Sequence, residues 1–257
     1  MTLDDLLAGR HQPYENWQVH TPAASQTNAA LSHDIALRLR NAIEQKGSAV
    51  LSVSGGKSPI ALFEHLSKQP IDWSRVWITL VDERCVPCTH PASNALLVRT
   101  HLCQHLAAKA NFIPMVTLAQ APLPSATALA HTASQALAGV PAADVMVLGM
   151  GEDGHTASLF PQAPNLTQAL DLQTEALCLP IELANPPENA PYARITQTLR
   201  HLLASRHVIL PLTGATKLAV LAQALSQAPH LSQSTPSLPI AYVLHQTQTP
   251  VALWIST

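Results

Sequence analysis

The chain of 257 residues carries 14 Lys and Arg against 16 Asp and Glu, so it lacks the basic surplus that a nucleic-acid partner requires. Hydrophobic residues make up 47% and charged residues 12%, which excludes a disordered chain, and the length fits a single domain over residues 1–257. No apolar stretch approaches the roughly 18 residues of a membrane span, and the sequence MTLDDLLAGR lacks the basic region of a signal peptide. We therefore expect a cytoplasmic protein with no membrane partner.

Helices and strands are predicted to alternate in the first part of the chain. Apolar residues at helical spacing predict a helix over residues 28–46, which Gly47 ends. The apolar run 49–53 predicts a buried strand, and Pro59 favours a helix over 58–67. The next predicted elements are a strand at 75–81, a helix at 94–106, a short strand near 112–116, a helix at 125–137 and a strand at 144–148.

The same alternation continues to the end of the chain. The predicted elements are a strand at 176–181, a helix at 195–204, a strand at 207–212, a helix at 215–226, a loop at 228–239 and a strand at 250–255. This order predicts an α/β fold with a mostly parallel sheet and helices on both faces. Ligands bind outside the carboxyl ends of such strands, so the residues that follow each strand are the first candidates for a site.

A glycine turn follows the first predicted strand, where Gly55 and Gly56 precede Lys57 and Ser58. Glycine lets the backbone approach a ligand closely, and a turn before a helix presents free N–H groups to an anion. The local sequence fits a phosphate site and a tight turn without a ligand about equally well. Asp82-Glu83-Arg84 follows the next strand, and by itself this charged triplet is more typical of the start of a solvated loop.

The motif GxGxxG occurs at residues 149–154, after the strand at 144–148. It invites a dinucleotide interpretation, but Glu152 and Asp153 would face the pyrophosphate, and Pro161 leaves no room for a long helix. The strand also lies late in the chain, whereas this fingerprint usually opens the first βαβ unit. We therefore reject a dinucleotide site here.

His155 lies in the same glycine-rich loop, two residues after Asp153. An imidazole beside a carboxylate is suited to general-base work near neutral pH, although a histidine that only caps a turn fits the local sequence equally well. Two later cations, Arg194 and Lys217, are each typical of a surface, but together with the glycine turn they could close a phosphate clamp.

Cys85 and Cys88 form a lone CxxC in a proline-rich segment. A structural zinc site needs a second pair of ligands, and a redox CxxC usually opens a helix, so we interpret these cysteines as incidental. No metal or cofactor is expected.

Five segments together resemble the 6-phosphogluconolactonases, within the larger group that includes the glucosamine-6-phosphate deaminases. They are VSGGKSP, LVDERCVP with Ser93-Asn94 downstream, LGMGEDGHTASLFP, RITQT and TGATK, in matching order over roughly residues 50–220. The deaminases typically carry Tyr where this chain has Arg84, and Glu-Pro where it has Phe160-Pro161. The resemblance is therefore to the lactonases. Lys57-Ser58 departs from the usual Ser/Thr or Arg/Thr pair, which leaves the contacts of that loop open.

The resemblance implies a Rossmann-like fold of the deaminase/isomerase/lactonase type and hydrolysis of 6-phospho-D-glucono-1,5-lactone without a metal or cofactor. It implies a phosphate loop at Gly55, Gly56 and Ser58, phosphate-side cations at Arg194 and Lys217, a general base at His155 and an active-site arginine at Arg84. Arg84 or a backbone N–H near Gly151 would stabilise the oxyanion, and Asp153 or Asp82 would orient the imidazole or the arginine.

Two other functions remain open, an amino-sugar-phosphate deaminase and a non-catalytic sugar-phosphate sensor. A dinucleotide enzyme ranks third, and failure to bind NAD(P) would exclude it. The sequence is compatible with a monomer or a small homo-oligomer.

Overall fold

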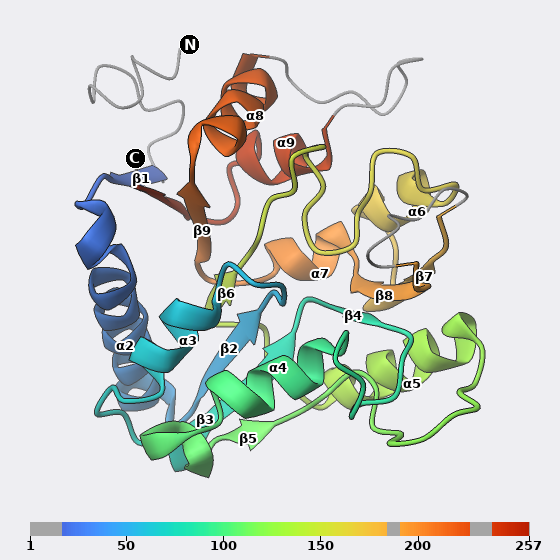
Figure 1. Cartoon of the computed structure of the whole chain (residues 1–257), viewed down its shortest axis with the longest axis horizontal. Helices are drawn as coiled ribbons and strands as arrows, with labels where there is room; N and C mark the ends of the chain where they lie inside the picture. Colours follow the sequence, from blue (N-terminus) through green and yellow to red (C-terminus); the bar gives the residue numbers. More distant parts are fainter. Residues whose placement is uncertain (1–16, 184–190, 227–237, 257) are drawn as a thin grey trace.

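A computed structural model describes residues 17–183, 191–226 and 238–256. Seven parallel strands form the main sheet in the order β1-β10-β9-β6-β2-β3-β5, with helices packed around it (Figure 1). A smaller antiparallel sheet has the order β4-β8-β7. The α/β architecture with a mostly parallel sheet is therefore confirmed.

The strands of the main sheet are β1 (Trp17–His20), β2 (Ala49–Val53), β3 (Val76–Leu80), β5 (Asn111–Phe112), β6 (Val145–Val147), β9 (Val208–Thr213) and β10 (Val251–Ser256). Those of the small sheet are β4 (Asp82–Arg84), β7 (Cys178–Ile181) and β8 (Arg194–Gln197). The α-helices are α2 (Thr27–Lys46), α3 (Ile60–Leu66), α4 (Asn94–His101), α5 (Ala126–Ala138), α6 (Leu166–Leu170), α7 (Leu199–Leu203), α8 (Ala215–Ser226) and α9 (Pro239–Leu244).

The main sheet is buried on both faces. Every residue of β2 is buried, as expected for a parallel strand covered by helices on either side. Side chains of a strand alternate between faces, and accordingly Leu51 and Val53 pack in one apolar cluster while Val50 packs in the other. None of the described helices combines the length and hydropathy required to cross a membrane.

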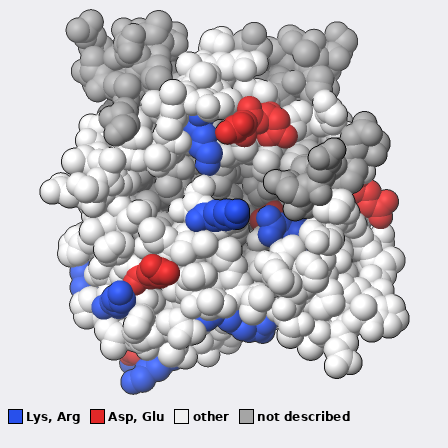
Figure 2. Space-filling model, viewed as in Figure 1, with Lys and Arg blue, Asp and Glu red and all other residues white. Residues whose placement is uncertain are grey.

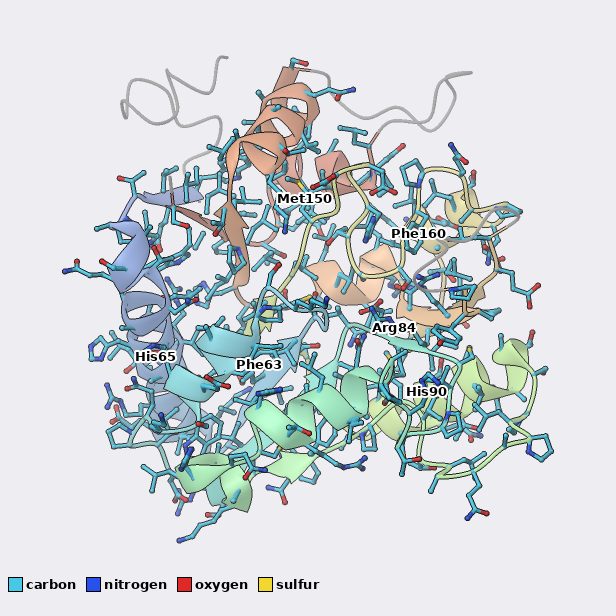
Figure 3. The ribbon with its side chains drawn as sticks, viewed as in Figure 1. Phe63, His65, Arg84, His90, Met150 and Phe160 are labelled. Atoms are coloured by element: carbon cyan, nitrogen blue, oxygen red, sulfur yellow. The ribbon has the colours of Figure 1, made fainter. Side chains whose placement is uncertain are left out.

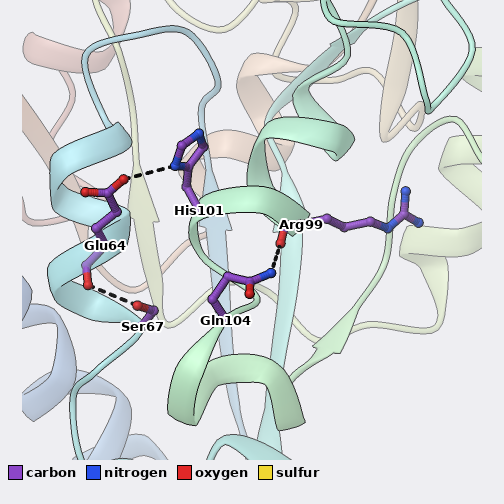
Figure 4. Close-up of polar contacts among 5 residues, drawn as sticks. All are labelled: Glu64, Ser67, Arg99, His101 and Gln104. Carbon is purple, nitrogen blue, oxygen red and sulfur yellow. Dashed lines mark hydrogen bonds and ion pairs between the residues drawn. The ribbon is translucent and has the colours of Figure 1, made fainter.

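Helices α3 and α4 pack side by side (Figure 4). Glu64 of α3 lies 3.1 Å from Nδ1 of His101 at the end of α4, on a surface where the Glu64 side chain is 54% exposed. An exposed pair of this kind contributes little to stability.

The predicted helix at 195–204 is wrong in its first part. Residues Arg194–Gln197 form β8, and only Leu199–Leu203 is helical, after Thr198 caps the helix by accepting a hydrogen bond from the His201 amide. Because β8 pairs with both β4 and β7, the β-branched Ile195 and Thr196 follow strand geometry and override the helical pattern.

Other elements also differ from the sequence-based expectation. Asp82–Arg84 is strand β4 rather than a loop, and the predicted helix at 94–106 ends at His101. Strand β1 and helices α6 and α9 were not predicted. The predicted loop at 228–239 lies outside the described residues apart from its last two, where Pro239 begins α9.

Candidate functional site

A cavity of about 610 Å³ opens at the carboxyl ends of the strands of the main sheet. Because these strands are parallel, the segments that follow β2, β6 and β9 converge at one edge, where the small sheet adds β4 (Figure 1). On the face seen in Figure 2, Lys and Arg side chains gather near the centre, beside acidic groups. The segments in which the sequence predicted site residues therefore meet at this cavity.

Most of the predicted site residues line this cavity. Those in its wall are Gly55, Gly56, Ser58, Asp82, Arg84, His155 and Lys217. Lys57 is exposed to solvent and lies outside the wall. Asp153 and Arg194 are also outside the wall, but both lie behind residues that reach the cavity.

The glycine turn after β2 presents unused backbone donors. Within the described residues, no group accepts a hydrogen bond from the backbone N–H groups of residues 55–58. Gly56 has φ of +91°, a left-handed conformation that glycine adopts without strain. A run of free N–H groups at the wall of a cavity is a site for an anion.

Gly55 is required for a different reason, which is the close approach of Asn94. A Cβ atom at position 55 would overlap the side-chain amide of Asn94. Asn94 is 1% exposed, lines the cavity, and donates from Nδ2 to the backbone oxygen of Asp82 at 2.9 Å. Asn94 lies within one of the motifs, but a contact across the chain leaves no local signal from which its role could be predicted.

Asp82 joins three segments of the site. It is 8% exposed, and its Oδ2 accepts a hydrogen bond of 2.6 Å from the hydroxyl of Ser158, in the loop after β6. Its Oδ1 lies 3.3 Å from Nδ2 of Asn94 on α4. Asp82 therefore fixes the loop after β6 and the start of α4 against β4.

Glu83 points away from the cavity and holds the N-terminus of α4. Its fully buried carboxyl group accepts hydrogen bonds from the amides of Arg84, Asn94 and Ala95 and from the Ser93 hydroxyl, at 2.7–3.0 Å. Burial raises the pKa of Glu83, and these hydrogen bonds oppose the rise. Within the triplet Asp82-Glu83-Arg84, Glu83 thus stabilises the fold, while Asp82 and Arg84 face the site.

Two arginines stand opposite each other in the small sheet, Arg84 on β4 and Arg194 on β8. Arg84 lines the cavity and donates from Nη1 to the Ala92 carbonyl at 2.7 Å. Arg194 is 4% exposed, and burial lowers its pKa, an effect that Asp82 opposes and Arg84 reinforces. An arginine keeps its proton at neutral pH, so this corner of the site is positively charged.

His155 is paired with Asp153. The Nδ1 atom of the imidazole lies 2.5 Å from Oδ1 of Asp153, which also accepts from the His155 backbone amide at 3.1 Å. Although burial by itself would raise the pKa of Asp153, its hydrogen bonds and charge attraction to His155 lower that pKa below the usual value. In the neutral imidazole that donates from Nδ1 to this carboxylate, Nε2 is the acceptor. No described residue forms a hydrogen bond to Nε2.

Gly151 packs against the same imidazole. A Cβ at position 151 would overlap the His155 ring, so glycine is needed for the ring to lie where it does. The Gly151 N–H donates to the His155 carbonyl at 2.8 Å. This particular N–H is therefore not available to an oxyanion, so the candidate donors that remain are Arg84 and the other backbone N–H groups near Gly151.

Lys217 reaches the cavity from the first turn of α8. Gly214, with φ of +91°, turns the chain between β9 and this helix. Lys217 forms no ion pair with any described residue. Thr27 and Asn28, at the N-terminus of α2, also line the cavity. They follow β1, a strand that was not predicted, so the search at strand ends missed them.

Cys85 and Cys88 are free thiols, and burial raises the pKa of Cys85 to about 11. At neutral pH that thiol is protonated and a poor nucleophile. Among the described residues, no group of three or more His, Cys, Asp or Glu side chains is arranged to hold a metal ion.

A family model for glucosamine-6-phosphate isomerases/6-phosphogluconolactonase matches residues 22–254. The chain belongs to this family. A 6-phosphogluconolactonase of Pseudomonas putida is 43% identical over 229 residues, which is 89% of each chain. One of Pseudomonas aeruginosa is 44% identical over 210 residues, 81% of this chain and 84% of its own. A solved 6-phosphogluconolactonase structure from Shewanella baltica has a TM-score of 0.84 and 39% identity, covering 95% of this chain and 99% of the other.

The family fold is shared more widely. A monomeric glucosamine-6-phosphate deaminase matches with a TM-score of 0.72 at 15% identity, a likeness of fold alone. The predicted deaminase/isomerase/lactonase fold is therefore confirmed. The GxGxxG segment opens no helix, because it is followed by a turn that bridges Thr156 and Leu159, and α6 begins only at Leu166. A Rossmann dinucleotide fingerprint requires a helix at that point.

Proposed function

We propose that this protein is a 6-phosphogluconolactonase, which hydrolyses 6-phospho-D-glucono-1,5-lactone to 6-phosphogluconate in the oxidative pentose phosphate pathway. The observation that carries the proposal is one cavity with free backbone donors at residues 55–58 in its wall and the Asp153–His155 pair beside them. Relatives at 43% and 44% identity that bear this enzyme's name support the choice within the family. We place the enzyme in the cytoplasm, as a monomer or small homo-oligomer.

The phosphate of the substrate binds at the glycine turn. The N–H groups of residues 55–58 and the hydroxyl of Ser58 donate to its oxygens, and Lys217 supplies a positive charge from α8. Arg194 adds to the positive potential from behind Arg84. This end of the site holds the sugar in place for the reaction at C1.

His155 then acts as the general base. Its Nε2 takes a proton from water while Asp153 holds Nδ1, and the water oxygen bonds to the C1 carbonyl carbon. Arg84 stabilises the negative charge that develops on the carbonyl oxygen. When the intermediate collapses, the bond from C1 to the ring oxygen breaks, and the ring oxygen receives the proton from His155. No metal ion or cofactor takes part in this proposal.

The first experiment compares the wild type with His155→Ala on freshly prepared lactone, above the spontaneous background. Loss of the base is expected to lower kcat by about 10²-fold or more. His131→Ala is the matched control, because His131 is exposed on α5 and outside the cavity wall. Activity should persist in EDTA, and loss restored by zinc would contradict the metal-free mechanism. The proposed function would be wrong if the wild type hydrolysed the lactone no faster than the spontaneous reaction. Release of ammonia from glucosamine 6-phosphate would then identify the protein as a deaminase.

A further inference from the structure

The catalytic imidazole proposed above lies on an open part of the site. The His155 side chain is 30% exposed and that of Asp153 is 52% exposed. Their hydrogen bond fixes Nδ1, but a single bond to a solvent-exposed carboxylate leaves the ring free to turn about that contact. Because a general base must reach its proton within hydrogen-bond distance, another group has to hold the plane of the ring.

Phe160 meets this requirement. Its ring stacks on the imidazole of His155 with the centroids 4.3 Å apart and an interplanar angle of 28°. The guanidinium of Arg194 lies over the same ring, with Cζ 4.9 Å from its centroid. Phe160 is 7% exposed and is not part of the cavity wall. In Figure 3 it lies on the loop above β4, the strand that carries Arg84.

The segment that carries Phe160 is more firmly held than the histidine. The Thr156 hydroxyl donates to the Gly149 carbonyl at 2.9 Å, and the Ser158 hydroxyl donates to the buried Asp82. The Ser158 amide donates to the Thr196 hydroxyl at 3.2 Å. Phe160 itself packs within the apolar cluster on one face of the sheet. The fixed aromatic ring of Phe160 can thus restrict the orientation of the less constrained imidazole by stacking against it.

We infer that Phe160 is a positioning residue, which holds the plane of the His155 ring so that Nε2 faces the cavity. The inference rests on the proposed function only for its effect on rate. The stacking should be measurable in the resting protein whatever the reaction is. Since Phe160 does not touch the cavity, removing its ring should act on kcat rather than on substrate binding.

The kinetic test compares Phe160→Leu with Phe160→Tyr. The leucine variant keeps an apolar side chain without a ring, and its kcat is expected to fall about tenfold or more while KM changes by less than about threefold. The tyrosine variant keeps the ring and should recover most of kcat. Phe112→Leu is the matched control, because Phe112 also packs under an arginine, Arg99, at 5.3 Å but is not the ring that stacks on His155. Its kcat should equal that of the wild type.

The second readout is independent of activity. In proton NMR, the ring current of Phe160 should move a His155 imidazole resonance upfield, and the signal is identified by its absence in His155→Gln. Phe160→Leu should remove this shift, and Phe112→Leu should leave it unchanged. An unshifted His155 signal in the wild type, or an unchanged kcat in Phe160→Leu, would overturn the inference. If the wild type has no lactonase activity, the proposed function fails, and the NMR result alone decides whether Phe160 positions the ring.

Discussion

At the scale of single residues, the site depends on contacts between side chains and bare backbone. Gly55 and Gly151 each lie where a Cβ would overlap a side chain of the site, Asn94 in one case and His155 in the other. Neither glycine is required for its backbone angle, since neither has a positive φ. Their common task is to let a functional side chain approach the loops that follow β2 and β6.

Gly55→Ala should therefore damage both the fold and the phosphate end of the site. The new methyl group displaces Asn94 from Asp82, and overpacking of this kind costs about 1–3 kcal/mol. Urea unfolding and KM for the lactone measure the two effects. Gly139→Ala is the control, because Gly139 has φ of −85° and nothing within 4 Å of the added atom. Equal stability of the two variants would contradict the role assigned to Gly55.

At the scale of elements, the short strand β4 connects the two sheets to the site. Its three residues alternate between two sides of the strand and do different work. Asp82 and Arg84 face the cavity, whereas Glu83 binds the first amides of α4. The negative charge at the start of a helix also fits the direction of the helix dipole. The orientation of Asn94 thus depends on a carboxylate that takes no part in the reaction.

Glu83→Gln should destabilise the protein by about 2 kcal/mol or more. An amide can accept at only one of its two polar atoms. Either the Arg84 and Asn94 amides at Oε1, or the Ala95 amide and Ser93 hydroxyl at Oε2, therefore lose their acceptor. Thermal or urea unfolding gives the loss directly. Glu64→Gln provides the comparison, because the exposed Glu64 carboxylate contacts one ring nitrogen, that of His101 at the end of α4 (Figure 4). A loss no larger than that of Glu64→Gln would exclude the anchoring role.

At the scale of the whole molecule, partly buried histidines away from the site couple stability to pH. Burial lowers the pKa of His20 on β1, of His201 on α7 and of His207 before β9. The unfolded chain then binds more protons than the folded protein once the pH approaches the unperturbed value of about 6.5. The stabilisation is complete above that pH and is lost as the pH falls toward the lowered pKa values.

The midpoint of urea unfolding should accordingly decrease between pH 7.5 and pH 5.5. His201→Gln should reduce part of this pH dependence, because burial alone lowers the pKa of His201. His131→Gln, at an exposed position of α5, should leave the slope unchanged. A midpoint that stays constant or rises on acidification would show that these imidazoles are not held in their neutral form.

By itself the sequence determined the parallel α/β architecture, and most of the site residues that it indicated line the cavity. Both follow from local patterns, since buried strands such as residues 49–53 are short apolar runs, and parallel strands bring their carboxyl ends to one edge. The motif after β6 also carried enough specificity to indicate the family, which the family match over residues 22–254 confirmed.

Only the tertiary structure decided how these residues are paired. It made residues 194–197 a strand, because two neighbouring strands satisfy their hydrogen bonds. It paired Asp153 rather than Asp82 with His155, left Lys57 in solvent, and brought Asn94 and Phe160 into the site. Each of these outcomes depends on packing between segments far apart in the chain or on the course of a loop. Periodicity and spacing describe only near neighbours and carry no record of such contacts.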